Sequence, residues 1–322
     1  MTLKQIYIRN REAIENIRFN GFYPVHYYNF WKDQRAKDVW FSRFVEHQGL
    51  LKNYSGKINF YSVLGSLQNL EKLHGGVNLF FSGENMHAER FADFRLLCEQ
   101  KNFDLYIDFD TTLSEKSIRF PLWLLYMFSP DSSYEDITKR VDQLRYSLKD
   151  NRKGFCSLVA SHDWNGIRGE MIDALSEIDT ISSGGKFRNN TDALNTQFAN
   201  NKHNFIGQYR FNICPENSNA PGYVTEKIFQ SIEAGCIPIY WGADNQPEPG
   251  ILNQDAILFW TINGDNRDVI DKIRQLQHES DYFRAFMAQP RFLPNADMKI
   301  IEMFDGLKEE ILKIIDSQRR GL

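Results

Sequence analysis

The segment 214–242 contains charged side chains at the predicted start of a helix. Residues 217–222 (NSNAPG) have the composition of a turn, and apolar residues recur at helical spacing after them. Tyr223, Glu226 and Lys227 therefore fall near the first turn of that helix. The unpaired amide groups and the dipole at a helix N-terminus favour an anion, and Lys227 adds a full positive charge.

The carboxylate at this position narrows the choice of ligand. Glu226 would repel a phosphate, but it can accept hydrogen bonds from sugar hydroxyls while Lys227 contacts phosphate oxygens. A ligand with both features is a nucleotide, so the segment predicts a nucleotide-binding site. The alternative is that Glu226 only balances the helix dipole and that Lys227 is solvated, and local chemistry alone does not separate the two.

The composition of the chain bounds the class of protein. A length of 322 residues favours two domains of ordinary size, and 42% apolar residues are enough for well-packed cores. The formal net charge of −4 argues against nucleic acid as the main partner, because such proteins present a basic face. A phosphorylated small molecule needs only a few cations and stays compatible with this charge.

The cysteines and the N-terminal residues indicate the compartment. The 4 cysteines are far apart and show no CxxC spacing, which predicts reduced, buried thiols. The N-terminal sequence MTLKQIYIRNREAIENIRFNG has no apolar run long enough for a signal peptide or an anchor. We therefore expect a cytoplasmic protein with at most peripheral contact with the inner membrane.

Predicted strands and helices alternate in both halves of the chain, which predicts an α/β fold with two mostly parallel sheets. The charged segment 149–154 (KDNRKG) is the predicted linker, so the expected domains are residues 1–150 and 151–322. The expected strands are 57–65, 77–85 and 103–110 in the first half, and 155–161, 209–213 and 237–241 in the second. The expected helices are 137–148, 171–178 and the one that follows residue 224.

The C-terminal segment predicts one more helix. Apolar residues recur at helical spacing from Ile300 to Ile314, interrupted by Gly306. The polar face mixes Lys, Glu and Asp, which favours a helix in the core over one on a membrane surface. We expect this helix to pack back on the N-terminal domain.

Several of these segments together resemble one enzyme family. The sequence ENSNAPGYVTEKIFQSIEAGCIPIYWG (216–242) resembles the signature of the bacterial-type α-1,3/1,4-fucosyltransferases of glycosyltransferase family ten. The segments KGFCSLVAS, GGKFRNN, LFFSGEN, DLYIDFD and RFPLWLLYM extend the similarity over residues 77–242. One departure is Cys214-Pro215, where many members have a small or apolar residue followed by Phe, and we interpret it as a variation in the loop.

The resemblance implies a fold and a reaction. It implies the glycosyltransferase B-type architecture, in which two Rossmann-like domains face each other across a cleft. The C-terminal domain would bind GDP-β-L-fucose, and the N-terminal domain an acceptor such as N-acetyllactosamine or a glycolipid precursor. L-fucose would pass with inversion to O3 or O4 of N-acetylglucosamine or glucose. No cofactor would be required, and Mn²⁺ or Mg²⁺ would at most stimulate. By analogy, the product would belong to lipopolysaccharide or capsule.

The resemblance also implies a set of donor-binding residues. Arg188 and Lys227 would stabilise the leaving diphosphate, because Arg offers a planar fork and Lys a point charge. Glu226 would accept hydrogen bonds from the ribose hydroxyls. Arg168 is a weaker candidate for diphosphate contact, and its alternative is an exposed arginine at a helix start. The remaining predicted donor-binding residues are Tyr223 and Asn217.

Glu84 is the predicted catalytic base. It follows the apolar strand VNLFF at its carboxyl end, where open α/β sheets build their sites, and it occupies the base position of the family's motif. Without the resemblance, a glutamate that caps the next helix is an equal alternative. Asp108-Phe109-Asp110 resembles a metal-binding DxD element, but the cations Arg188 and Lys227 already serve the diphosphate, so no coordinated metal is predicted.

Three other functions remain as alternatives. A dehydrogenase of similar fold is disfavoured because no GxGxxG follows a strand. A non-catalytic sugar-binding module is disfavoured because a binder does not need a base. A transferase of the same fold that uses another nucleotide-activated sugar stays open, because the phosphate site would serve many donors.

Overall fold

The computed structural model describes residues 3–321 except for 33, 53, 112, 113, 147–151 and 153. The chain divides into two compact units. The first consists of Met1–Ser133 and Ile301–Leu322, and the second of Tyr134–Ile300. The predicted domain division at residue 150 stays a prediction, because most of the expected linker, 149–154, lies outside the described residues.

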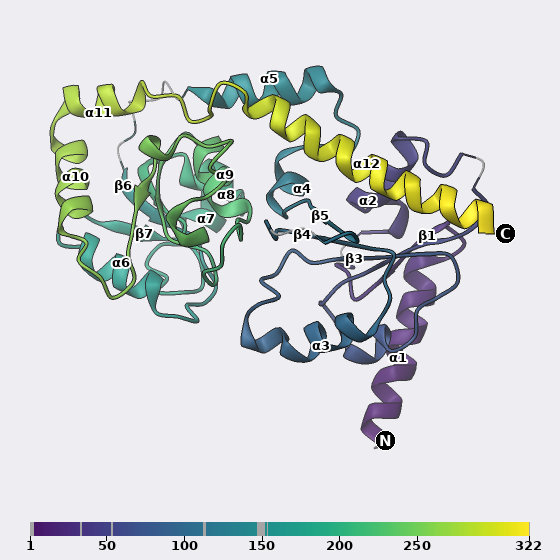
Figure 1. The fold of residues 1–322 in the computed structure, drawn as a ribbon. Helices are drawn as coiled ribbons and strands as arrows, with labels where there is room; N and C mark the ends of the chain where they lie inside the picture. Colours follow the sequence, from purple (N-terminus) through teal and green to yellow (C-terminus); the bar gives the residue numbers. More distant parts are fainter. Residues whose placement is uncertain are drawn as a thin grey trace. The chain divides into compact units, whose positions relative to one another are not determined.

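The first unit contains a parallel sheet of 5 strands in the order β1-β2-β3-β4-β5 (Figure 1). Its central strand β3 is buried at all 5 positions, as expected for a parallel sheet covered on both faces. Three of the strands confirm the predictions, and β1 and β5 were not predicted. The strands are β1 (Val25–Tyr28), β2 (Ile58–Tyr61), β3 (Val77–Phe81), β4 (Leu105–Asp108) and β5 (Ser117–Arg119).

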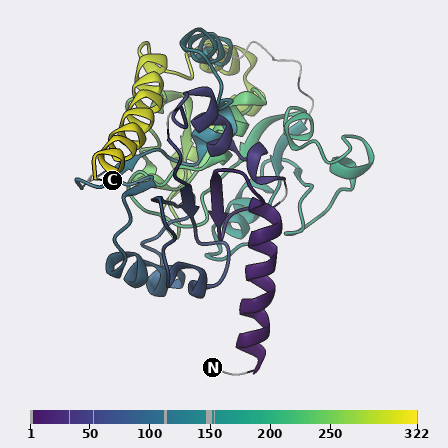
Figure 2. The same cartoon turned by 90° about the vertical axis from the view of Figure 1, so that its right-hand side faces the viewer.

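Helices cover both faces of this sheet (Figure 1), and aromatic side chains pack them against it. On one face Phe41 of α2 (Trp40–His47) stacks on Phe60, and Trp40 packs against Phe304 of the C-terminal helix. On the other face α3 (Ala92–Gln100) covers a cluster that includes Phe80. Helix α4 (Trp123–Met127) follows β5. Helix α1 (Leu3–Asn20) packs beside β1, and its N-terminal part extends beyond the rest of the unit (Figures 1 and 2).

The predicted C-terminal helix is confirmed as α12 (Ala296–Gly321). Ile300, Phe304 and Leu307 are buried, so the helix packs in a core as expected. Gly306 interrupts its apolar stripe because the helix approaches β5 closely there: a Cβ at this position would lie 3.2 Å from Cδ1 of Ile118. No helix in the described part of the chain combines the length and the apolar character that a membrane crossing requires.

The second unit contains a parallel sheet of 5 strands in the order β10-β9-β8-β6-β7. The chain passes from β6 to β7 on one side and then returns across β6 to β8, so the direction of the connections reverses between β6 and β8. The predictions for β6, β8 and β9 are confirmed, and β7 and β10 were missed. The strands are β6 (Gly154–Leu158), β7 (Ile181–Ser183), β8 (Tyr209–Ile213), β9 (Ile237–Tyr240) and β10 (Leu258–Phe259).

The helices of the second unit contribute to two separate apolar clusters. One cluster joins the sheet to three helices, α6, α10 and α11, and the other contains residues of α8 and of the turn after α9. The predicted helices at 137–148, at 171–178 and after residue 224 are confirmed as α5, α6 and α9. The helices are α5 (Tyr134–Arg145), α6 (Ile167–Leu175), α7 (Ala193–Thr196), α8 (Lys202–Ile206), α9 (Glu226–Glu233), α10 (Arg267–His278) and α11 (Ser280–Met287).

Candidate functional site

A pocket lies where the strand order of the second sheet reverses. Its volume is about 220 Å³, and residues 158–162 at the carboxyl end of β6 and 212–215 at the carboxyl end of β8 form much of its wall. Open α/β sheets bind ligands at such a position, because two neighbouring strands send their connections in opposite directions and leave a crevice at their carboxyl ends. The topology therefore points to this pocket as the candidate site.

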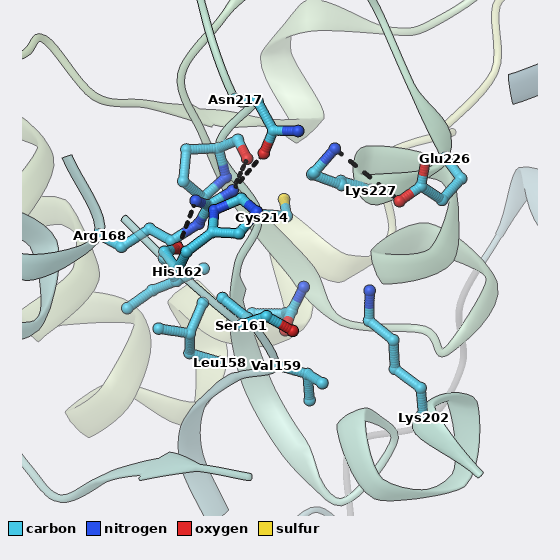
Figure 3. A pocket seen from close by; sticks show the side chains of 14 residues that line it. Leu158, Val159, Ser161, His162, Arg168, Lys202, Cys214, Asn217, Glu226 and Lys227 are labelled. Atoms are coloured by element: carbon cyan, nitrogen blue, oxygen red, sulfur yellow. Dashed lines mark hydrogen bonds and ion pairs between the residues drawn. The ribbon is translucent and has the colours of Figure 1, made fainter. Parts of the chain in front are cut away.

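The pocket carries three strongly basic side chains and one carboxylate. Arg168 comes from the second position of α6, Lys202 from the first position of α8 and Lys227 from the second position of α9. Figure 3 shows the ammonium groups of Lys202 and Lys227 turned toward the same space, with Glu226 beside Lys227. An excess of positive charge at the N-terminus of α9 suits a phosphorylated ligand.

A buried glutamate holds Lys227 in place. Glu216 is 0% exposed, and its Oε2 lies 3.1 Å from Nζ of Lys227. The same carboxylate accepts hydrogen bonds from the backbone amide and the hydroxyl of Thr225, at 2.8 and 2.6 Å, and so caps α9. Gly242 leaves room for it, because a Cβ there would lie 2.7 Å from Cγ of Glu216.

The charges in the pocket set the protonation states. Burial opposes the charge of Lys227, but the carboxylates of Glu216 and Glu226 outweigh burial and raise its pKa. Burial likewise opposes the charge of Glu226, and Lys227 and Lys202 outweigh it and lower the pKa of that carboxyl. The pKa of Lys202 is lowered, mainly by burial. Lys202 therefore loses its proton at a lower pH than an exposed lysine, and a bound anion would favour its charged form.

Arg168 is a buried member of the site. It is 4% exposed, and its guanidinium donates to the carbonyl of His162 at 2.7 Å and to Oδ1 of Asn217 at 2.9 Å. It thereby links the loop after β6 to the loop after β8. The alternative of an exposed arginine at a helix start is wrong, because the side chain is buried, lines the pocket and is held by the carbonyl of His162 and by Asn217.

Arg188 lies outside this pocket. Its guanidinium is exposed and pairs with Asp173 of α6, with Nη2 at 3.1 Å from Oδ2. Its Nη2 is also near the start of α6, 3.2 Å from where a Cβ on Gly169 would be. Tyr223 is 2% exposed and is not among the lining residues, whereas Asn217, Glu226 and Lys227 are. The donor-binding roles of all of these residues stay predictions.

Two residues of the site were missed by sequence reasoning. Glu216 opens the motif ENS, so its position in the motif was a usable signal for a structural role. Lys202 lies in the unremarkable segment NNKHNF, and only the packing of α8 beside α9 brings it to the pocket, where Nζ donates to Oε1 of Gln230 at 2.7 Å. No local pattern marks it.

Glu84 lies in the loop after β3 of the first unit. Oγ of Ser82 accepts from the backbone amide of Glu84 at 3.1 Å and donates to its carbonyl at 2.9 Å, which holds the loop. Arg90 donates to Oε2 of Glu84 at 2.6 Å. At the end of the neighbouring strand β4, burial raises the pKa of Asp108 to about 6. No cluster of three or more His, Cys, Asp or Glu that could hold a metal ion occurs among the described residues.

An aromatic pocket of about 220 Å³ lies at the end of the first sheet where the Glu84 loop follows β3. It is lined by Phe30 and Trp31, which follow β1, by Trp40 of α2, and by Tyr126 of α4, a residue that is 57% exposed. Leu122 connects this aromatic pocket to the Glu84 loop, because a Cβ on the neighbouring Gly83 would lie 2.9 Å from Cδ1 of Leu122. The aromatic pocket therefore begins one residue from Glu84.

Two family models match the chain. The alpha-(1,3)-fucosyltransferase FucT N-terminal domain matches residues 25–126, and the C-terminal part of glycosyltransferase family 10 (fucosyltransferase) matches residues 148–298. The first match spans β1 to β5, and the second spans β6 to β10. Each match thus contains one complete sheet.

Related proteins agree with these matches. The alpha-(1,3)-fucosyltransferase FucT of Helicobacter pylori is 30% identical over 254 residues, which cover 67% of this chain and 49% of that protein. The putative fucosyltransferase R654 of Acanthamoeba polyphaga mimivirus is 22% identical over 225 residues, or 67% of this chain and 35% of that protein. The chain spans about half the length of the first relative and about a third of the second.

Solved structures show the same fold. A crystal structure of an alpha1,3-fucosyltransferase with GDP-fucose superposes with a TM-score of 0.58 at 23% identity and covers 88% of this chain and 90% of that chain. A structure with GDP superposes with a TM-score of 0.55 at 22% identity, with coverages of 90% and 92%. The predicted α/β fold with two Rossmann-like sheets, resembling the glycosyltransferase B type, is confirmed.

Proposed function

The chain belongs to glycosyltransferase family 10, the fucosyltransferases, and we propose that it transfers L-fucose from GDP-β-L-fucose to a hydroxyl group of an oligosaccharide. The observation that carries this proposal is the basic pocket at the strand-order reversal, where Arg168, Lys202 and Lys227 surround the start of α9. A diphosphate fits this set of charges, and Glu226 supplies an acceptor for ribose hydroxyls. The solved relatives named with GDP and GDP-fucose support the choice of nucleotide.

The reaction requires stabilisation of the leaving group. The bond between the anomeric carbon and the β-phosphate oxygen of GDP breaks, and negative charge grows on the diphosphate. Lys227, held by Glu216, and Arg168, held by Asn217, are fixed before the ligand binds, so they stabilise this charge with little reorganisation. Lys202 adds a third charge.

Arg188 joins the diphosphate-binding residues in this proposal. Its pair with Asp173 is exposed to water, and exposed ion pairs contribute little stability, so the guanidinium can exchange this partner for a phosphate at small cost. The position of Arg188 beside the start of α6 keeps it near the loops that follow β6. The family motif GGKFRNN supports the same role.

Glu84 is proposed as the base. The acceptor hydroxyl attacks the anomeric carbon from the face opposite to GDP, its oxygen forms the new glycosidic bond, and its proton passes to the carboxylate of Glu84. A single displacement of this kind converts the β-linked donor into an α-linked product. Arg90, whose Nη2 lies 2.6 Å from Oε2, orients the carboxylate.

The aromatic pocket beside the Glu84 loop is the proposed acceptor site. Sugars present apolar faces of C–H groups that pack well on aromatic rings, and Tyr126 and Trp31 offer such rings near the base. We propose N-acetyllactosamine, attacked at O3 of its N-acetylglucosamine, as the acceptor. The reaction is proposed to need no divalent cation, since the basic side chains neutralise the diphosphate.

A single assay separates this proposal from its rivals. The protein is incubated with N-acetyllactosamine and, in parallel, with GDP-fucose, GDP-mannose or UDP-galactose, in the presence of EDTA, and nucleotide release and product mass are measured. Fucosylated product with GDP release supports the proposal. Product with another donor identifies a transferase for a different sugar. Saturable binding without any product identifies a sugar-binding module.

A further inference from the structure

A cavity of the first unit lies beneath α1 and has no part in the proposed reaction. Its volume is about 450 Å³, and it lies between Asn16 and Asn20 of α1, His26 of β1 and the segments that precede β2 and β3. Glu84 follows β3, whereas Lys57 and His74 precede β2 and β3. We call this cavity the α1 pocket. It lies at the end of the first sheet opposite to the proposed base.

Buried polar atoms line the α1 pocket. Oδ1 of Asn16, Nε2 of His26 and Oε1 of Gln68 are buried without a hydrogen-bond partner among the described residues. Asn16 is 6% exposed and His26 is 8% exposed. Buried polar groups in folded proteins almost always have a partner, and two of these three atoms are amide oxygens, which can only accept. A ligand that supplies hydrogen-bond donors, such as hydroxyl groups, would satisfy these amide oxygens.

The mouth of the α1 pocket is basic. Lys57 and Lys72 line it and are exposed, and His74 stacks on Tyr28 with ring centroids 4.4 Å apart. Burial and the charge of Lys57 lower the pKa of His26, and burial and the charges of Lys72 and Lys57 lower the pKa of His74. The lysines thus place positive charge at the mouth of a pocket whose buried amide oxygens have no hydrogen-bond donor among the described residues.

We propose that the α1 pocket binds a small hydroxylated anion of the sugar-phosphate class, with its anionic group at Lys57 and Lys72 and its hydroxyls donating to Asn16 and Gln68. Inorganic phosphate lacks the hydroxyl groups that could donate to the amide oxygens. A neutral sugar has no negative charge to pair with the lysines. The flat face of Tyr28 and His74 accommodates a sugar ring. The cavity volume lies in the usual range for small-molecule sites.

Calorimetric titration of the full chain tests this site, with glucose 6-phosphate, inorganic phosphate and glucose as probes and with saturating GDP present. We expect glucose 6-phosphate to bind saturably, and the other two probes to bind at least about tenfold more weakly. Because GDP fills the basic pocket of the second unit, binding that persists with GDP belongs elsewhere. Binding of glucose 6-phosphate that is seen without GDP but lost in its presence, or no saturable binding at millimolar concentration, would overturn the proposal. Neither result depends on transferase activity.

Two variants locate the binding, and one controls for it. The exposed pair Lys57→Ala/Lys72→Ala should weaken both glucose 6-phosphate and inorganic phosphate about tenfold or more. Asn16→Leu should weaken glucose 6-phosphate alone, because it removes only a hydroxyl partner. Lys52→Ala, an exposed lysine of the same unit that does not line the pocket, should change neither. Equal affinity of the wild type and the double-lysine variant would place the anion elsewhere and refute the site.

Discussion

Nζ of Lys227 lies 3.1 Å from Oε2 of Glu216, a carboxylate that is 0% exposed. This pair fixes the proposed phosphate-binding ammonium group at the start of α9 before any ligand is present. Glu216 also accepts both hydrogen bonds from Thr225, so one buried carboxylate caps the helix and positions its cation. The stability of the second unit and its affinity for the donor are therefore coupled at one residue.

Lys227→Met should separate these two effects. It leaves Glu216 buried without its charged partner, which should lower the free energy of unfolding by about 3 kcal/mol in urea titrations. Affinity for GDP should fall by about 2 kcal/mol in calorimetry. Adding Glu216→Gln should restore much of the stability but none of the GDP affinity. Recovery of GDP binding in the double variant would show that Lys227 does not contact the phosphates.

Lys202→Met should change how GDP binding depends on pH. Because burial lowers the pKa of Lys202, this lysine loses its proton at a lower pH than an exposed lysine does, and a bound diphosphate favours the protonated form. Wild-type affinity for GDP should therefore decrease as pH rises into the alkaline range. The variant should bind GDP more weakly at neutral pH and show a flatter dependence. Lys139→Met, an exposed lysine of α5, is the matched control, and an unchanged profile in Lys202→Met would exclude the role.

Replacing either partner of the ion pair between Arg188 and Asp173 should change the affinity for GDP differently. Arg188→Ala should weaken GDP binding by about 1–2 kcal/mol if the guanidinium turns to the diphosphate. Asp173→Asn removes only the competing partner, so GDP binding should stay equal or tighten slightly. Parallel calorimetry of the two variants measures both effects. Full GDP affinity in Arg188→Ala would remove Arg188 from the donor site.

Glu84→Gln should stop turnover while donor binding persists. The amide cannot take the acceptor proton, so kcat should fall about 10²–10⁴-fold, while Kd for GDP stays at its wild-type value. Transfer is followed by GDP release, and donor affinity by calorimetry. Glu89→Gln, an exposed glutamate five positions further on, should behave as the wild type. A Glu84→Gln enzyme with ordinary kcat would rule out Glu84 as the base.

Tyr126→Ala should weaken binding of the acceptor and leave binding of the donor unchanged. Loss of one aromatic face in the aromatic pocket should raise KM for N-acetyllactosamine by about fivefold, equivalent to about 1 kcal/mol, and leave KM for GDP-fucose unchanged. Steady-state kinetics with each substrate varied in turn distinguishes the two. Tyr134→Ala, a tyrosine of similar exposure on α5, serves as the control. If KM for the acceptor is unaltered, the acceptor binds elsewhere.

Local patterns were sufficient for the elements whose signal is short-range. The strand YRFNI was predicted over the same residues as β8, and the helix after the NSNAPG turn was predicted as α9. Both have apolar periodicity next to strong turn residues, and local periodicity is what a sequence displays directly. Strand β1, with the sequence VHYY, was missed because its buried His26 breaks the apolar run.

The residues of the site likewise fall into those that a local motif predicts and those that only tertiary packing brings together. The motif from Glu216 to Gly242 determined that a cation and a carboxylate stand together at the start of one helix, since these residues are neighbours in the chain. Only the tertiary structure decided that Arg168 and Lys202 join them and that Arg188 stands outside, paired with Asp173. The reason is that strand order and helix packing arise from contacts between residues far apart in the chain, and the reversal between β6 and β8, which creates the pocket, is written in no single segment.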